Sequence, residues 1–325
     1  MNRQIGRFGY CSIVICLTLQ FGPNPVFGEE STTQKAVLVT GASSGIGRKI
    51  TEKIAAEGHF VYAGARKDAD MAELNEIDNV QAIRLDVTKQ SDIDAAVDTV
   101  KAGGRGLHAI VNNAGVNVIG PLIEIEESEL DFLFDVNIYG PYRITKAFAP
   151  MIIESQGRIS NISSISGTLS GPLYGIYSMS KHALEAYTDS LEWEMHNLGV
   201  KVSAIEPGNF KTRIYHTRCD RLLEQGYSPE GSLFQEYVIR MYDTCKERPE
   251  DTDPEPDIVA DAVYHALFDE NPKQHYLVVP RQQEAEWTIR KAIEELVSLN
   301  RDHEFSYSRD QLIKMLDEEM APSAD

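Results

Sequence analysis

The sequence has few cysteines, and the four present are not arranged to bind a metal. Cys11 and Cys16 lie near the start of the chain, and Cys219 and Cys245 lie in its body. No CxxC pair occurs and no cysteine–histidine spacing matches a zinc ligand set, so we expect no metal site. If the chain is exported, Cys219 and Cys245 are free to pair, and the sequence leaves that pairing open.

Positive charge is also scarce. The chain carries 50 acidic residues against 31 Lys and Arg, a formal net charge of -19. Such a surface repels phosphate backbones, which argues against nucleic acid as a partner. No internal repeat or low-complexity run interrupts the 325 residues. Their composition and length suit one large soluble domain with a full core.

Long apolar runs are absent except at the start, where residues 8–21 follow Arg3 and Arg7. A basic start, a short apolar run and Gly28 at a possible cleavage point predict a signal-like leader over residues 1–30. A weak membrane anchor and an unused extension are the alternatives. Membrane association is expected only through residues 8–21. The chain is then cytoplasmic if the leader is unused, and otherwise exported or membrane-associated through residues 1–28.

Short apolar, β-branched runs alternate with stretches of helical spacing, which is typical of a parallel sheet covered on both faces. We therefore predict an α/β fold, a doubly wound Rossmann-type sheet, in one domain over residues 31–325. The strands are expected at 35–40, 60–65, 81–85, 109–111, 158–163, 200–205 and 276–279. The main helices are expected at 45–57, 92–100, 130–153 and 177–198.

Two segments fall outside this alternation. Residues 210–256 lack a strand pattern but are rich in apolar side chains, including Phe234 and Tyr237. We interpret them as a helical insertion that forms a lid over a lipophilic substrate, with simple packing on the core as the alternative. Residues 281–325 form a C-terminal tail with one predicted amphipathic helix.

A glycine-rich turn lies between the first strand and the first helix. Glycines there let the backbone approach a pyrophosphate, whose charge the helix N-terminus favours. The residues expected to contact a dinucleotide in this turn are Gly41, Ser43, Ser44, Gly45, Ile46 and Gly47.

Residues at the ends of the next strands refine the cofactor prediction. Arg66 follows the second strand, where an acidic residue would grip a ribose 2′-hydroxyl, and a cation there suits a 2′-phosphate. We therefore expect NADP(H), with NAD(H) the less favoured cofactor. Asp86, with Val87, is expected at the adenine. The small residues after the fourth strand suit close packing on a cofactor: Asn113, Ala114 and Gly115.

Tyr177 and Lys181 are four residues apart on a predicted helix, which places both on one face. An ammonium beside a phenol favours the phenolate and lowers the pKa of the tyrosine. Such a phenol can exchange a proton with an alcohol or ketone. Ser164 lies thirteen residues before the tyrosine.

These motifs occur in the order typical of the short-chain dehydrogenase/reductase family, which the chain resembles over about residues 35–280. The matching segments are TGASSGIG at 40–47, NNAG at 112–115, Asn137 in NIYG, Ser164 in NISS, Tyr177 with Lys181, and Pro207–Gly208 followed by Thr212. The local sequence is most similar to retinol and 17β-hydroxysteroid dehydrogenase-type members.

The resemblance implies roles for these residues. Tyr177 is the acid/base, and Lys181 lowers its pKa and holds the nicotinamide ribose. Ser164 orients the substrate oxygen, and Asn137 supports a water-mediated proton relay. The resemblance also places Pro207, Gly208 and Thr212 at the cofactor.

The sequence thus predicts an NADP(H)-dependent oxidoreductase that interconverts a secondary alcohol and a ketone or aldehyde on a lipophilic substrate of the steroid, retinoid or fatty type. An epimerase or dehydratase on the same fold, or a non-catalytic NADP-binding regulator, are the alternatives. We expect a small lipophilic substrate as partner, and a homodimer or homotetramer.

Overall fold

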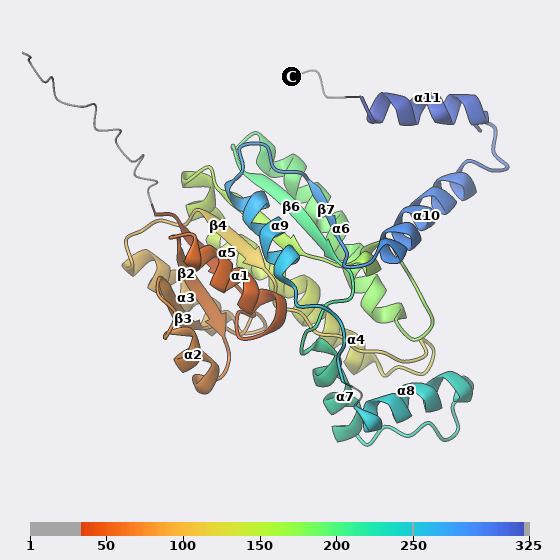
Figure 1. Cartoon of the computed structure of the whole chain (residues 1–325), viewed down its shortest axis with the longest axis horizontal. Coiled ribbons are helices and arrows are strands. Elements are labelled where there is room, and N and C mark those ends of the chain that lie inside the picture. Colours follow the sequence, from red (N-terminus) through yellow and green to blue (C-terminus); the bar gives the residue numbers. More distant parts are fainter. Residues whose placement is uncertain (1–33, 249, 322–325) are drawn as a thin grey trace, which may run out of the picture. The chain divides into compact units, whose positions relative to one another are not determined.

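The computed structural model describes residues 34–248 and 250–321, so the predicted leader over residues 1–30 lies outside the described residues. Seven parallel strands form one sheet in the order β3-β2-β1-β4-β5-β6-β7 (Figure 1). The strands are β1 (Ala36–Val39), β2 (Phe60–Ala65), β3 (Val80–Arg84), β4 (Ala109–Asn112), β5 (Arg158–Ile162), β6 (Lys201–Pro207) and β7 (His275–Val278). The predicted Rossmann-type fold is confirmed.

Helices cover both faces of this sheet and bury an apolar core on each. The face covered by α1 and α9 buries residues such as Ile50, Ile54 and Val263, and the opposite face, covered by α3, α5 and α6, buries Ile93 and Phe148. The helices of the body are α1 (Gly45–Ala56), α2 (Asp68–Leu74), α3 (Gln90–Ala102), α4 (Glu127–Phe134), α5 (Gly140–Glu154), α6 (Gly175–His196) and α9 (Asp257–Phe268).

The central strand β1 pairs with β2 on one side and β4 on the other. The order of the strands reverses at this point, and ligands of doubly wound sheets bind in the crevice at the carboxyl ends of such strands. The glycine-rich turn follows β1 and the NNAG segment follows β4, so the topology brings the two segments to one crevice.

All seven strands lie where the sequence predicts them, with ends shifted by one or two residues. The helix predicted at 130–153 is instead interrupted by a π-helical turn, Asp135–Tyr139, between α4 and α5. The structure adds three helices to those predicted: α2, α9 and α11 (Arg309–Glu319). α2 has only seven residues, too few to show a helical period in the sequence.

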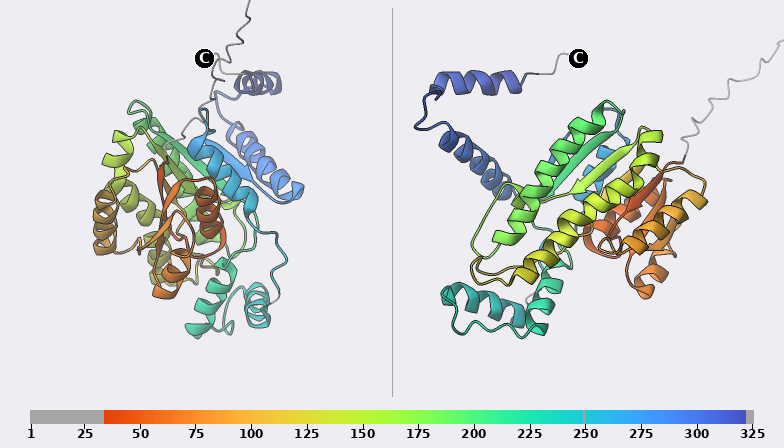
Figure 2. Two further views of the ribbon diagram at one scale, coloured as in Figure 1. Left: turned by 60° about the vertical axis from the view of Figure 1, so that its left-hand side comes forward. Right: turned by 180° about the vertical axis from the view of Figure 1, so that it is seen from behind.

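The predicted insertion forms two helices, α7 (Ile214–Glu224) and α8 (Gln235–Glu247), which lie side by side (Figures 1 and 2). A disulfide between Cys219 and Cys245 joins them. Both sulfurs belong to a small apolar cluster that also contains Leu222, Val238 and Met241. The predicted lid therefore packs in a small apolar cluster, here called the lid core, which also includes Ile119 from outside the insertion.

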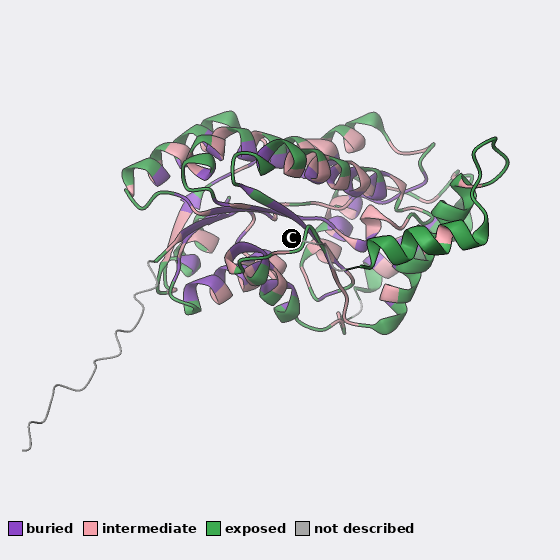
Figure 3. Cartoon of the chain, turned by 90° about the horizontal axis from the view of Figure 1, so that it is seen from above, coloured by how far each residue is buried: buried purple, intermediate pink, exposed green. Residues whose placement is uncertain are grey.

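The C-terminal tail contains the predicted helix α10 (Gln282–Leu299), followed by α11. α10 buries only Glu284 and Thr288, and α11 buries no residue, as the exposed colouring of both in Figure 3 shows. Within residues 34–248 and 250–321, no helix has the length and apolar character to cross a bilayer.

Candidate active site

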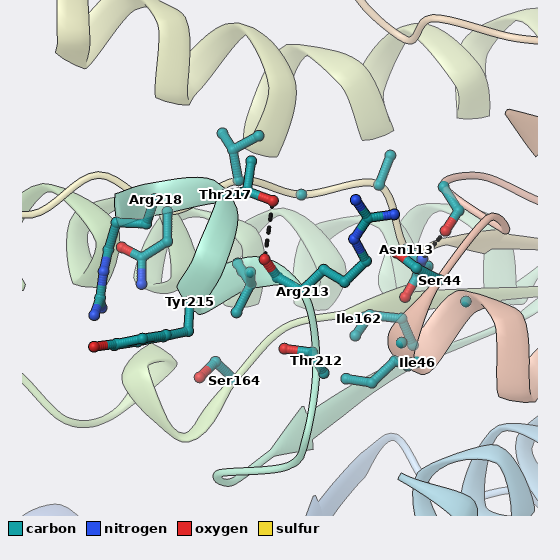
Figure 4. A pocket seen from close by; sticks show the side chains of 18 of the residues that line it. Ser44, Ile46, Asn113, Ile162, Ser164, Thr212, Arg213, Tyr215, Thr217 and Arg218 are labelled. Carbon is teal, nitrogen blue, oxygen red and sulfur yellow. Dashed lines mark hydrogen bonds between the residues drawn. The ribbon is translucent and has the colours of Figure 1, made fainter. Parts of the chain in front are cut away.

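One cavity of about 620 Å³ opens at the carboxyl edge of the sheet (Figure 4). It gathers nearly all residues predicted from the motifs, although they come from seven separate segments. The predicted residues that line it are Gly41, Ser43, Ser44, Gly45, Ile46, Gly47, Arg66, Asp86, Val87, Asn113, Ala114, Gly115, Ser164, Tyr177, Lys181, Pro207, Gly208 and Thr212. Of the predicted catalytic and cofactor-binding residues, only Asn137 is not among those that line the cavity.

Hydrogen bonds lock the glycine-rich turn to the NNAG segment. The Thr40 hydroxyl accepts from the backbone N–H of Asn113 and of Ala114, both at 3.0 Å. The Asn113 amide donates in return to the carbonyls of Thr40 at 2.9 Å and Gly41 at 3.0 Å. The polar groups of two loops thus satisfy each other and fix the shape of the crevice.

The glycines of the turn are required by space and by backbone angle. A Cβ on Gly47 would lie 2.3 Å from both the Asn113 amide nitrogen and the Gly41 carbonyl. Gly41 and Gly45 have φ of +64° and +55°, and a Cβ on Gly45 would lie 3.2 Å from that of Thr212. Ser44 is the N-cap of α1, but its side chain accepts no hydrogen bond from the first turn of the helix. The backbone N–H groups of that turn are therefore open to an anion. This cradle fits the pyrophosphate of a dinucleotide.

Arg66 and Asp86 lie at the same end of the cavity, as their positions after β2 and β3 require. Burial alone would raise the pKa of Asp86, but hydrogen bonds from Thr88 and the charges of Arg66 and Lys89 together lower it. The backbone N–H and hydroxyl of Thr88 both donate to Asp86 Oδ1, at 3.1 and 2.7 Å. Asp86 is therefore held ionised beside an arginine.

Tyr177 projects from the first turns of α6 into the cavity, next to Ser164. Burial raises the pKa of the Tyr177 phenol to about 12, and the Ser164 hydroxyl lowers it in part. Ser164 is the N-cap of a short 3₁₀ helix, Ile165–Gly167, and its Oγ accepts from the Ser166 N–H at 3.1 Å. The cap fixes the serine where it meets the phenol.

Lys181 is buried one turn further along α6, with 6% of its surface exposed. Its Nζ donates to the Ile162 carbonyl at 2.9 Å and lies 5.7 Å from the centroid of the Tyr177 ring. Burial lowers the pKa of Lys181 to about 8, against the raising effect of Glu185. The sequence predicted that this ammonium lowers the pKa of Tyr177. That direction is wrong for the chain without cofactor, because burial of the phenol raises its pKa.

Asn137 lies in the π-helical turn behind the cavity and is 1% exposed. Its Oδ1 accepts from Val116 N–H at 2.9 Å, while its amide donates to the Val116 carbonyl at 2.9 Å and to Ser180 Oγ at 3.1 Å. Both amide N–H groups are thus used within the protein, and the predicted relay stays a prediction. The side chain ties the wall of the cavity to α6.

One residue near the cavity has no local signal in the sequence. Glu284 at the start of α10 is 2% exposed, and its Oε2 accepts from the backbone N–H of Asn209 at 2.9 Å. Arg281 donates to the same carboxylate at 3.0 Å. The C-terminal tail therefore holds the loop after Pro207–Gly208, a contact across 75 residues that no sequence pattern announces.

The lid meets the cavity through α7 and not through the residues expected. Tyr215, Arg218 and Arg221 line the cavity, as do Thr244 of α8 and residues 250–253. Phe234 and Tyr237 do not, and they are 39% and 52% exposed. The apolar residues of α8 that face α7 form the lid core, and neither Phe234 nor Tyr237 is among them. The predicted lid over a lipophilic substrate stays a prediction, and α7 is the helix of the insertion that lines most of the cavity on this side.

Comparison with known proteins agrees with this geometry. The sequence profile of the short chain dehydrogenase family matches residues 35–221. The chain belongs to this family. It is an oxidoreductase that acts on a hydroxyl or keto group with NAD(P).

Individual relatives cover most of the chain. The mitochondrial D-beta-hydroxybutyrate dehydrogenase of Rattus norvegicus is 34% identical over 272 residues, 76% of this chain and 77% of the relative. An NADPH-dependent 3-dehydrocapnine reductase of Ornithobacterium rhinotracheale is 32% identical over 75% of this chain and 88% of its own. The crystal structure of a Streptomyces avermitilis short-chain dehydrogenase superposes with a TM-score of 0.69 at 31% identity, covering 83% of this chain and 96% of that one. The similarity to retinol and 17β-hydroxysteroid dehydrogenases stays a prediction.

Proposed function

We propose that the chain is an NADP(H)-dependent oxidoreductase that interconverts a secondary alcohol and a ketone on a substrate with an apolar body. The observation that carries the proposal is the single cavity that joins the glycine-rich cradle to Ser164, Tyr177 and Lys181. A cofactor-binding turn and a proton-donating phenol at one cavity are what hydride transfer to a carbonyl requires.

The preference for NADP(H) rests on Arg66. This arginine lines the cavity at the end of β2, where NAD enzymes of this architecture place an acidic residue. No salt bridge engages Arg66 within the described residues, so its guanidinium is available for a 2′-phosphate. The name of the relative from Ornithobacterium rhinotracheale, an NADPH-dependent reductase, supports the same cofactor.

The proton is handled by Tyr177. When bound, the nicotinamide supplies or accepts the hydride. With a pKa raised to about 12, the phenol is protonated at neutral pH and ready to donate to a carbonyl oxygen. Ser164 beside it is placed to hold that oxygen by a second hydrogen bond. Burial lowers the pKa of Lys181 to about 8, and its ammonium holds the end of β5 through the Ile162 carbonyl.

The apolar body of the substrate is proposed from the cavity wall. Phe132, Ile165, Ile214 and Tyr215 contribute apolar surface to the cavity. A wall of this kind binds a substrate largely by removing apolar area from water, at roughly 25 cal/mol per Å².

The test is an absorbance assay at 340 nm, the conventional wavelength for NADPH, with ketones, steroids, retinoids and aliphatic alcohols. We expect NADPH oxidation with at least one apolar ketone, and about tenfold or greater preference for NADPH over NADH. Product formation without net cofactor consumption would indicate an epimerase or dehydratase instead. Tight NADPH binding with no turnover on the whole panel would contradict the proposal.

A further inference from the structure

Arg218 is the most unusual residue of the cavity wall. It projects from α7, lines the cavity and is 9% exposed. Its Nη1 donates to the Tyr174 hydroxyl at 3.0 Å, and its guanidinium lies 4.7 Å from the centroid of the Tyr215 ring. The buried Nε has no hydrogen-bond partner. Across the described part of the chain, no carboxylate lies within 4.0 Å of this guanidinium.

Arg221, one turn further along the same helix, is an arginine of this wall that is paired with a carboxylate. Its Nε and Nη2 donate to the two carboxylate oxygens of Glu129 at 2.8 and 2.6 Å. Both arginines line the cavity, but only Arg221 has its charge neutralised within the protein. Among the described residues, the guanidinium of Arg218 contacts the hydroxyl and ring of Tyr174 and the ring of Tyr215, all of them uncharged.

A buried guanidinium without an anion is costly, because a phenol hydroxyl restores little of the solvation that it loses. Proteins normally pair such a group, and at a cavity wall the missing anion can come from the ligand. The planar fork of arginine matches the two oxygens of a carboxylate, and a desolvated pair of this type is short and strong.

The position of Arg218 separates it from the cofactor end. Figure 4 shows Arg213 extending toward Ser44 and Asn113 at the glycine-rich turn, whereas Arg218 extends the other way along α7. The partner of Arg218 is Tyr174, which precedes Tyr177 by three residues at the start of α6. Arg218 therefore belongs to the substrate end of the cavity, and its partner Tyr174 lies three residues before the proton donor.

We propose that Arg218 binds an oxyanion head group of the substrate, and that the substrates are oxo acids and hydroxy acids with an apolar body. This inference rests on the proposed function and adds the substrate class to it. The apolar wall would take the chain, and the arginine would fix one end of it at a set distance from Tyr177. A carboxylate is the head group we test first. A sulfonate is the alternative, because it is also an oxyanion that can accept hydrogen bonds from a guanidinium.

A purely structural role offers a different account, in which Arg218 only holds the Tyr174 hydroxyl. The variant Tyr174→Phe separates the two, since it removes that hydroxyl and keeps the arginine. If Arg218 is a ligand-binding residue, Tyr174→Phe retains preference for an anion. If the arginine serves only Tyr174, Tyr174→Phe and Arg218→Met have the same effect.

The first experiment measures binding and needs no turnover. Dissociation constants of decanoate, decyl sulfonate and decanol are measured by calorimetry on the full-length chain loaded with NADP⁺. We expect wild type to bind decanoate about tenfold to a hundredfold more tightly than decanol. Arg218→Met should remove that preference, and Arg218→Lys, which keeps the charge without the fork, should retain part of it.

Arg240→Met is the matched control, because Arg240 is an exposed arginine on α8 that does not line the cavity. It changes the net charge equally and should leave the preference intact. Equal affinity of wild type for decanoate and decanol, or a preference that survives in folded Arg218→Met, would overturn the inference. If Arg218→Met does not fold, a full wild-type preference in Arg218→Lys would overturn it as well. Tighter binding of the sulfonate than of decanoate would identify a sulfonate head group.

The second experiment uses ten-carbon oxo acids, with the ketone at successive positions, and their methyl esters. Wild type should reduce at least one acid with a KM about tenfold or more below that of its ester. Preferential decanoate binding without reduction of any ketone would support this inference and contradict the proposed function. Reduction of the esters with no preference for any acid would support the proposed function and contradict this inference.

Discussion

The two walls of the cavity are built in different ways. The cofactor wall consists of short loops at strand ends, fixed by bonds between Thr40, Asn113 and the turn itself. The substrate wall is α7, which is held by α8 through a disulfide and the lid core, and by the bonds of Arg221 to Glu129. The first wall is part of the sheet, and the second is attached to it. We therefore expect changes to the first to affect every reaction of the enzyme, and changes to the second to affect substrates selectively.

Lys181 provides the strongest test of the cofactor wall, because it bonds to the last residue of β5 and lies next to Tyr177. Lys181→Met should lower the turnover rate about a hundredfold and weaken NADPH binding. Fluorescence titration and steady-state rates measure both effects. Lys181→Arg is the control for charge, and normal NADPH affinity in Lys181→Met would remove the residue from the cofactor site.

The same variant carries a pH signature in stability. The pKa of Lys181 is lowered by burial from 10.5 to about 8, so between these values the unfolded chain binds the extra proton. The contribution of Lys181 to stability should therefore rise as pH rises above about 8. Urea unfolding of wild type and Lys181→Met at pH 7 and pH 10 measures the difference. The free energy of unfolding of wild type, relative to that of Lys181→Met, should be larger at pH 10 than at pH 7. A difference that is the same at both pH values would contradict a lowered pKa of Lys181 in the folded protein.

Gly47→Ala should distort the cofactor wall and lower the turnover rate less than Lys181→Met does. Its Cβ would overlap the Gly41 carbonyl, and overpacking of this kind costs about 1–3 kcal/mol. We expect NADPH affinity to fall about tenfold or more, with all substrates affected alike. Gly171→Ala is the control, since a Cβ there meets nothing within 4 Å. Equal effects of the two substitutions would show that crowding at Gly47 is unimportant.

Arg66→Asp should change which cofactor is used without altering the substrate wall. It removes the cation from the proposed 2′-phosphate site and offers an acceptor to a 2′-hydroxyl. The ratio of kcat/KM for NADPH to that for NADH should fall about tenfold or more. Lys67→Asp makes the same charge change at the next residue and serves as control. A wild type that already prefers NADH would contradict the assignment.

The smallest effect is expected at the disulfide of the substrate wall. It joins residues 26 apart in the sequence, and its loss should destabilise the insertion by about 3.5 kcal/mol or less. The double variant Cys219→Ala/Cys245→Ala should raise KM for bulky ketones a few-fold and leave NADPH affinity unchanged. Wild type under reducing conditions should behave in the same way. A parallel loss of NADPH affinity would show that the two walls are not independent.

The same contrast explains what the sequence could predict. The strands, the glycine turn and the positions of Ser164 and Tyr177 follow from local patterns, because each depends on residues near in sequence. The contact of Glu284 with Asn209 spans 75 residues, so no period or motif contains it. The sequence also does not show that α7 is the helix of the insertion that lines the cavity. Phe234 and Tyr237 are more apolar than Arg218, yet the lid core takes up the inner face of α8, and only the folded lid shows which helix lines the cavity.

Burial was the other quantity that the sequence could not supply. A four-residue spacing indicates that Tyr177 and Lys181 share a face, but it does not say how far that face is enclosed. Enclosure raises the pKa of the phenol to about 12 and lowers that of the ammonium to about 8. Both shifts favour the neutral form of the group, and the rise in the pKa of Tyr177 is opposite to the expected direction.

The most direct test of the account is Tyr177→Phe, measured as single-turnover NADPH oxidation alongside NADPH affinity. The substitution removes only the phenolic oxygen at which the substrate proton is exchanged, so the volume and the ring remain. We predict a fall of about a hundredfold to ten-thousandfold in the rate of hydride transfer, with NADPH affinity unchanged. A rate within about tenfold of wild type would contradict the assignment of Tyr177 as the acid/base and with it the proposed mechanism.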